Sequence, residues 1–177
     1  MYWRTWSSWV GIVVLLVSGC GGHEQTAQST DETATQEEPM EQALNTEEAV
    51  ERLEEHITNT VAVLPETLEL EPVGPVIKGA SCDDPTDGGS QDRVMAARSY
   101  WLTGLPVEDN EANAELLHQY WTDHGYVMVH DDRPDDMYIA VRNEEDAFSL
   151  ALRSNIDGKL SISASSPCFW PEGTPPA

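Results

Sequence analysis

The stretch AFSLALRSNIDGKLSISAS, residues 147–165, carries the pattern that decides the fold. Apolar residues occupy every second position on either side of a polar centre: Phe148, Leu150, Leu152, Leu160, Ile162 and Ala164. Alternation with a period of two is typical of β-strands that bury one face. The centre, Asn155–Gly158, holds residues that favour the tight turn of a hairpin. The stretch therefore predicts two adjacent antiparallel strands.

Three more strands are expected before this hairpin, at Arg93–Leu102, Tyr126–His130 and Met137–Arg142. Segments 131–136 and 143–146 separate the later strands, and their Asp and Asn residues are typical of turns. Strands that follow one another through short turns pair antiparallel. The five strands together predict one antiparallel sheet.

A first helix is expected to begin at Asn45, because Asn is a favourable N-cap and Glu48 follows three residues later. Its apolar residues recur at helical spacing: Val50, Leu53, Ile57 and Val61. Pro65 is incompatible with a helix interior and marks its end. Segment 64–78 contains three prolines and is expected to be an extended connection without regular structure.

A second helix is expected from Asp109 to His124, with Gly125 as the residue beyond its C-terminus. Its apolar stripe is formed by four residues: Leu116, Leu117, Tyr120 and Trp121. Two helices can cover only one face of such a sheet. The sequence therefore predicts an α+β fold, a two-layer sandwich with an antiparallel sheet of about five strands and two helices on one face.

Residues 1–19 have the charged, apolar and small-residue parts of a secretory signal. The apolar run 10–17 is far shorter than the ~20 residues that a membrane-spanning helix needs, so a cleaved signal is expected. The end of this signal, Val17-Ser18-Gly19-Cys20, resembles the lipobox of bacterial lipoproteins. That resemblance implies a diacylglyceryl group on the Cys20 thiol and acyl chains such as palmitate at the new N-terminus. The alternative is an ordinary secreted protein with a stray cysteine.

The resemblance to a lipobox also implies a location, the extracytoplasmic face of the cell membrane. Two acyl chains would hold the protein there stably, whereas one would hold it only marginally. Residues 20–43 are polar and acidic without apolar periodicity, which predicts a disordered tether. Residues 44–177 are expected to form a single α+β domain.

The chain carries 32 acidic residues against 9 basic ones, and loss of the signal with Arg4 would move the net charge from −23 to −24. This balance excludes a nucleic-acid partner, because phosphate binding needs clustered Lys and Arg. It also disfavours flat contact with an anionic lipid surface. Two interpretations of the acidity are open, namely a cationic ligand or partner, or solvation of the whole surface in a salty or alkaline habitat.

Two cysteines, Cys82 and Cys168, remain once Cys20 is assigned to lipid. A pair of cysteines in an extracytoplasmic domain predicts one disulfide bond. A metal-binding pair is the alternative, but neither cysteine has the closely spaced partner that is typical of zinc sites. The bond would close a loop of more than eighty residues.

The motifs predict no metal, cofactor or catalytic site. A calcium loop starting at Asp83 fails, because Pro and Val occupy its third and twelfth positions. Glu115 and His118 have the Glu-x-x-His spacing of di-iron bundles, but a single pair lacks the further ligands of such a site. The four aspartates of turn 131–136 could bind a cation, although Asp is ordinary in turns. A non-catalytic protein is therefore expected.

Several segments together resemble small actinobacterial lipoproteins of uncharacterised function: Val17–Cys20, Cys82 in its Gly- and Asp-rich loop, Tyr120-Trp121 with Gly125-Tyr126, Asp146–Leu150 and Ala164–Cys168. The resemblance implies a cellular location and a disulfide, and it implies no activity. We expect a non-catalytic interaction module that meets another envelope protein or a wall polymer. The alternative is a small-ligand or cation-binding lipoprotein that uses the open face of the sheet or the acidic turns.

Overall fold

The structure, a computed structural model, describes residues 44–82, 90 and 92–176. The expected signal, Cys20 and the tether lie outside these residues. In chain order the elements are helix α1 (Thr46–Val61), strands β1 (Glu69–Pro72), β2 (Ile77–Ser81) and β3 (Val94–Thr103), a 3-10 helix η1 (Val107–Asp109), helix α2 (Asn110–Asp123), and strands β4 (Tyr126–Asp131), β5 (Tyr138–Asn143), β6 (Ser149–Ser154) and β7 (Leu160–Ser165).

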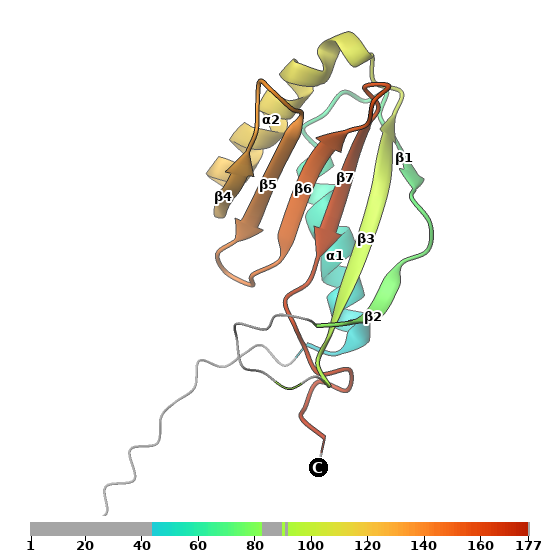
Figure 1. The fold of residues 1–177 in the computed structure, drawn as a ribbon, viewed down its shortest axis with the longest axis vertical. Helices are drawn as coiled ribbons and strands as arrows, with labels where there is room; N and C mark the ends of the chain where they lie inside the picture. The colour runs from blue at the N-terminus through green and yellow to red at the C-terminus, as the bar shows by residue number, and fades with distance from the viewer. Residues whose placement is uncertain (1–43, 83–89, 91, 177) are drawn as a thin grey trace, which may run out of the picture. The chain divides into compact units, whose positions relative to one another are not determined.

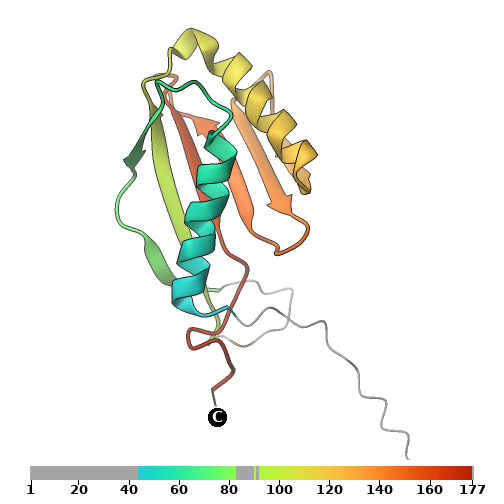
Figure 2. The ribbon, with the colours of Figure 1, turned by 180° about the vertical axis from the view of Figure 1, so that it is seen from behind.

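The seven strands form one antiparallel sheet in the order β1-β3-β7-β6-β5-β4, and β2 pairs with β3 along the same edge as β1. Helices α1 and α2 lie against one face of this sheet, and no described element covers the other face (Figures 1 and 2). The predicted two-layer α+β fold is confirmed. The sheet has seven strands, however, where the sequence predicted about five.

The two additional strands lie in and just after segment 64–78, which was expected to be irregular because of its prolines. Pro72 pairs with Tyr100 of β3 as the last residue of β1. An edge strand has one side without a partner, so it tolerates a residue that lacks an N–H. Immediately afterwards, the Val73 N–H donates to the Ser99 carbonyl oxygen at 2.9 Å. The prolines are therefore compatible with an edge strand, although they would not be compatible with a strand inside the sheet.

Helix α1 begins as the sequence predicts. The Asn45 side chain accepts hydrogen bonds from the N–H groups of Glu47 and Glu48 at 2.9 and 3.0 Å. The Glu48 carboxylate in turn accepts from the Asn45 N–H at 3.1 Å. This capping box satisfies backbone donors that the first helical turn leaves free. The predicted apolar face packs on the sheet, and Leu53 and Ile57 are fully buried.

Helix α2 presents three of its four predicted apolar residues to the core, Leu117, Tyr120 and Trp121. Leu117 and Trp121 are fully buried as expected, but Leu116 is 42% exposed. Asn113 and Ala114 are buried in its place. Positions 113, 117 and 121 are spaced by four residues and lie on one side of a helix, whereas Leu116 is rotated away from them. The predicted stripe is therefore confirmed except at Leu116, and the buried face also includes Asn113 and Ala114.

The centre of the sheet confirms the alternation seen in residues 147–165. The inward side chains of β5, β6 and β7 form much of the core: Ile139, Val141, Leu150, Leu152, Leu160, Ile162 and Ala164. Strands β6 and β7 pair from Ser149↔Ser165 to Ser154↔Leu160 across the predicted turn. Strand β7 then pairs with β3 on its other side, so the last strand of the chain lies in the middle of the sheet.

A disulfide joins Cys82 to Cys168, with their α-carbons 5.8 Å apart, as the sequence predicted. Cys82 directly follows β2, and its N–H donates to the Arg93 carbonyl oxygen at 3.2 Å. Cys168 precedes Phe169, which exchanges two backbone hydrogen bonds of 2.9 Å with Val94. The bond therefore links the end of β2 to the chain that leaves β7, at one end of the sheet.

Candidate functional site

The face of the sheet opposite the helices is the first candidate site. Because side chains alternate along a strand, the neighbours of the buried residues in β3, β5, β6 and β7 point away from the helices. We call these residues the open face: Met95, Ala97, Ser99, Trp101, Thr103, Tyr138, Ala140, Arg142, Ser149, Ala151, Arg153, Ser161, Ser163 and Ser165. None of these residues of β3, β5, β6 and β7 is acidic, in a chain with 32 acidic residues, and the edge strand β1 adds Glu69 and Glu71 on the same side, opposite Thr103 and Trp101.

Small side chains form the floor of the open face. The strand registers place Ala140, Ala151, Ser163 and Ser99 in one row across β5, β6, β7 and β3. This row lies in a shallow hollow of about 330 Å³, which Val129 of β4 also lines. Alanine and serine leave the backbone of the sheet close to the surface, so a partner can approach it closely.

Two exposed guanidinium groups, Arg142 and Arg153, stand at opposite ends of the β5–β6 pair. Neither forms an ion pair among the described residues, and Arg153 lies only against the Tyr138 ring at 5.8 Å. Four other bases have carboxylate partners, as Arg133 has with Asp131 at 2.7 Å; they are Arg52, Arg98, Arg133 and Lys159. The open face thus holds two guanidinium groups that form no ion pair within the part of the chain that the structure describes.

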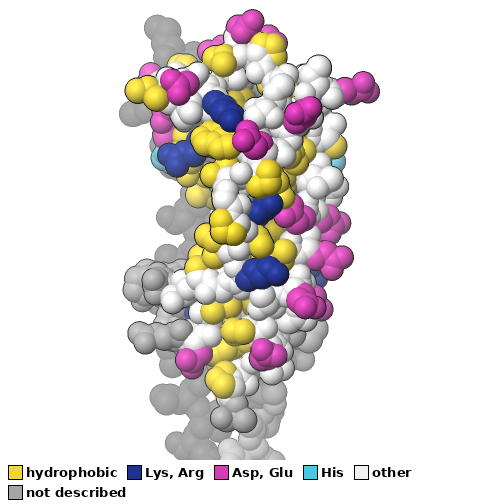
Figure 3. Space-filling model, turned by 90° about the vertical axis from the view of Figure 1, so that its right-hand side faces the viewer, with side chains coloured by type: hydrophobic (Ala, Val, Ile, Leu, Met, Phe, Trp, Pro, Cys, Tyr) yellow, Lys and Arg dark blue, Asp and Glu magenta, His cyan; other side chains and the backbone are white. Residues whose placement is uncertain are grey.

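The border of the open face combines apolar and basic groups. The Lys159 ammonium lies 4.9 Å from the centre of the Trp101 ring and pairs with the Glu71 carboxylate at 3.2 Å. Figure 3 shows the β1–β2 edge, where hydrophobic side chains gather with Lys and Arg among them and most Asp and Glu lie toward the right of the view. Val73 and Ile77 are among the exposed hydrophobic residues of this edge.

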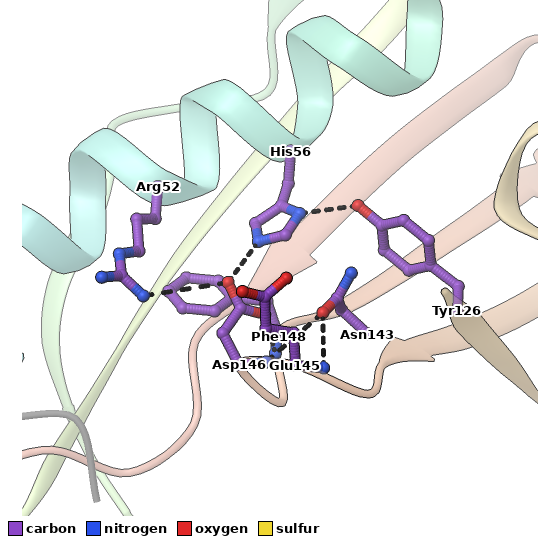
Figure 4. Close-up of polar contacts among 7 residues, drawn as sticks. All are labelled: Arg52, His56, Tyr126, Asn143, Glu145, Asp146 and Phe148. Atoms are coloured by element: carbon purple, nitrogen blue, oxygen red, sulfur yellow. Dashed lines mark hydrogen bonds and ion pairs between the residues drawn. The ribbon is translucent and has the colours of Figure 1, made fainter. Parts of the chain in front are cut away.

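A polar cleft of about 450 Å³ between α1 and the β5–β6 turn is the second candidate site. His56 of α1 is its central group (Figure 4). The His56 Nδ1 atom lies 2.6 Å from the Tyr126 hydroxyl oxygen, and Nε2 lies 2.9 Å from Oδ2 of Asp146. An ionised carboxylate can only accept, so Nε2–H donates to Asp146, and the protonation of the ring sets whether Nδ1 accepts from the Tyr126 hydroxyl or donates to it. We call these three residues the His56 relay.

The surroundings fix the His56 relay in place. The Phe148 ring is fully buried and packs against the imidazole with ring centres 4.9 Å apart. Asp146 also lies 3.9 Å from the Arg52 guanidinium. The Asn143 side-chain oxygen accepts hydrogen bonds from the N–H groups of Glu145 and Asp146, which shapes the turn that carries the carboxylate.

The electrostatics of the His56 relay suit a structural contact. Burial raises the pKa of the Tyr126 hydroxyl to about 12, so this group stays protonated at neutral pH. Burial alone would also raise the pKa of the Asp146 carboxyl, but the hydrogen bond and charge of His56 outweigh it and lower that pKa. The arrangement joins α1, β4 and the β5–β6 turn.

The other residues singled out in the sequence are separated from this relay. Glu115 pairs with Arg133 at 3.2 Å. In the acidic turn, Asp131 also pairs with Arg133, while Asp132 lies 2.7 Å from the His130 imidazole. Among the described residues, no cluster of three or more His, Cys, Asp and Glu side chains could hold a metal ion.

Two further sequence expectations concern the N-terminus and the loop after Cys82. Cys20 and the loop that begins at Asp83 lie outside the described residues. Within residues 44–82, 90 and 92–176, neither helix has both the length and the apolar character needed to cross a membrane. The His56 relay was not predicted, because no local motif joins residues 70 and 90 positions apart.

Asp146→Asn is expected to lower the free energy of unfolding by about 2 kcal/mol at pH 7, because a partly buried charge-assisted hydrogen bond is lost. The folded-state pKa of Asp146 is depressed, so its stabilisation is present above the unfolded pKa of about 3.9 and is lost as pH falls through the folded value. The difference between wild type and variant should therefore shrink toward pH 3. Urea titrations from pH 3 to pH 7 measure this.

The neighbouring variant Glu145→Gln is the matched control, because Glu145 is exposed and adjacent in the same turn. It removes the same charge and should leave the unfolding free energy within about 0.5 kcal/mol of wild type. A constant difference between Asp146→Asn and wild type across this pH range would contradict the assigned role of the carboxylate.

Comparisons with known proteins give one likeness. No protein-family model matches the chain, and no curated protein matches it. Among solved structures, the chain is similar to LppA of Mycobacterium tuberculosis, which is named as a lipoprotein. The two share 16% sequence identity over 78% of this chain and 89% of LppA, with a TM-score of 0.42.

Proposed function

We propose that the protein is a lipid-anchored, extracytoplasmic component of the cell envelope and that its domain is a non-catalytic interaction module. Val17–Cys20 supports the anchor, because its position between an apolar run and a polar tract is that of a lipobox. The Cys82–Cys168 disulfide supports an oxidising compartment outside the cytoplasm. No cofactor is required for this role.

The acid-free open face is the observation that carries the proposed interaction. Helix α1 on the other side of the sheet contains five glutamates, whereas the fourteen residues of the open face contain no acid. Acids cover the two sides of the sheet unevenly: β1 carries Glu69 and Glu71 at the edge of the open side, and the outward residues of β3, β5, β6 and β7 include none. A partner that docks on a surface without carboxylates is not repelled by negative charge. It also does not have to remove water from buried carboxylates. The partner is another envelope protein or a wall polymer.

Site-specific photo-crosslinking in the intact envelope tests this function. A photoreactive residue is placed at Ser163 in the middle of the open face, and a matched probe replaces the exposed Glu51 of α1. Both are expressed as the full-length, lipidated chain. We expect an adduct from the Ser163 position and none from the Glu51 position. Equal adducts from both positions, or none from Ser163, would overturn the assignment of the open face.

Cys20→Ser is expected to abolish lipidation and to block processing before residue 20. The thiol is the group that receives the diacylglyceryl chain, and a serine hydroxyl cannot replace it. Two acyl chains contribute about 0.8 kcal/mol per buried methylene, so their loss should release the protein from the membrane fraction. Mass spectrometry of that fraction decides the matter. A wild-type protein that carries an unmodified Cys20 at its mature N-terminus would refute the anchor.

The polar cleft favours a second candidate function, the binding of a small cationic ligand. Three carboxylates line it, from Glu55, Glu145 and Asp146, against the single guanidinium of Arg52. The stacked rings of Tyr120 and His124, 4.0 Å apart, offer an aromatic wall. Thermal-shift measurements with a panel of small organic amines test this function. Stabilisation that disappears in Glu145→Gln would support it, and no shift with any amine would count against it.

A further inference from the structure

We infer that the open face binds the acidic surface of a folded protein, whose carboxylates reach Arg142 and Arg153. This inference rests on the proposed interaction module and names the chemistry of its partner. Binding of a wall polymer in place of a protein is one of the outcomes that the test distinguishes.

The first argument is the lack of acidic partners for these two bases. Acidic residues outnumber basic ones 32 to 9, so a surface arginine has many carboxylates with which it could pair. Arg52, Arg98 and Arg133 all do so in the structure. Arg142 and Arg153 are exposed and have no such partner among the described residues. Their positive charge is therefore available to an approaching carboxylate, which a guanidinium can bind with two parallel hydrogen bonds.

The second argument is the geometry between the two arginines. Arg142 pairs with Ser149, and Arg153 lies four residues farther along the same strand. At about 3.3 Å per residue, the two side chains start roughly 13 Å apart on the same face. The register places Ala140 opposite Ala151 between them. Two acid contacts can therefore flank a flat, small-residue centre on which a helix or strand of a partner can lie.

The third argument distinguishes a protein from a wall polymer. Sugar rings commonly stack on free aromatic faces, but Lys159 lies against the Trp101 ring and Arg153 lies near the Tyr138 ring. A long anionic polymer would extend past the open face toward acidic groups such as Glu71. The net charge of the chain is −23, so such a polymer would be repelled there. A folded protein can concentrate its acids opposite the two arginines and keep its remaining surface neutral. Charge complementarity therefore favours a protein.

Charge reversal in the lipidated full chain tests the inference, with the photo-crosslinking probe at Ser163. Arg142→Glu and Arg153→Glu should each reduce the yield of the adduct, and the double variant should reduce it by about tenfold or more. Lys78→Glu is the matched control, because Lys78 is an exposed base of β2 outside the open face. It makes the same charge change and should leave the yield unaltered. The melting temperatures of all variants are compared to establish that they fold.

The nature of the adduct completes the test. We expect a discrete species that protease digests and that wall-degrading muramidase leaves intact, with the cross-linked peptide near Asp or Glu residues. Changing those acids to arginine in the partner should restore the adduct with the Arg142→Glu, Arg153→Glu double variant. A muramidase-sensitive adduct, or a protein adduct that is indifferent to charge reversal, would overturn this inference while leaving the interaction module intact. No adduct at Ser163 would instead overturn the proposed function itself.

Discussion

Replacement of both Cys82 and Cys168 by serine is expected to lower the free energy of unfolding by about 4 kcal/mol. The disulfide joins residues 86 positions apart, so it restricts the part of the chain from β3 to β7 in the unfolded state. Small domains have total stabilities of only about 5–15 kcal/mol. Loss of the bond should therefore remove a large share of the stability and leave the domain close to unfolding at physiological temperature.

The location of the bond gives a second, local expectation. Cys82 and Cys168 hold together the end of β2 and the chain that follows β7, next to the Val94–Phe169 hydrogen bonds. Hydrogen exchange of those two backbone N–H groups should accelerate more than exchange in the central strands. Urea denaturation of the oxidised wild type, the reduced wild type and the double serine variant measures the global effect. Oxidised and variant proteins of equal stability would contradict the expected role of the bond.

The sequence was most informative where local pattern and final environment agree. Segment 147–165 alternates apolar and polar residues because β6 and β7 are central strands with one face on the helices, and the structure places them as expected. The cap at Asn45 is equally local, since donor and acceptor lie within four residues. Such elements can be predicted because the residues that determine them are close in the chain.

The edge of the sheet was less predictable, because β1 and β2 owe their strand conformation to pairing with β3. Their own residues include prolines and few buried side chains, so they lack the alternating apolar signal of an internal strand. The order of the strands could not be predicted either, since the pairing of β7 with β3 joins segments far apart in sequence. The number of strands was underestimated for this reason.

Both candidate sites depend on this long-range arrangement. The outward positions of β6, including Arg153, follow from alternation alone, but their combination with Ser163 and Ser99 into one acid-free face requires the strand order. The His56 relay brings together α1, β4 and a turn, and no pattern around His56 indicates its partners. The disulfide could be predicted without that knowledge, because only two cysteines remained to pair.

Trp121→Ala is expected to lower the free energy of unfolding by about 3–5 kcal/mol, since it removes a large buried side chain and leaves a cavity. Trp121 is fully buried in α2, and its indole N–H donates to the Thr60 hydroxyl of α1 at 3.2 Å. It therefore connects the two helices of the layer as well as packing in the core. The other fully buried apolar residues of α2, Ala114 and Leu117, are much smaller than the indole.

Two control variants separate the packing of Trp121 from its hydrogen bond. Trp121→Phe keeps most of the apolar volume but leaves the buried Thr60 hydroxyl without this donor, and should cost about 1–3 kcal/mol. Adding Thr60→Val to that variant removes the unsatisfied hydroxyl and should recover part of the loss. Chemical denaturation of the three proteins and the wild type gives the comparison. If Trp121→Ala were no less stable than Trp121→Phe, the helix layer would not depend on the volume of the indole ring.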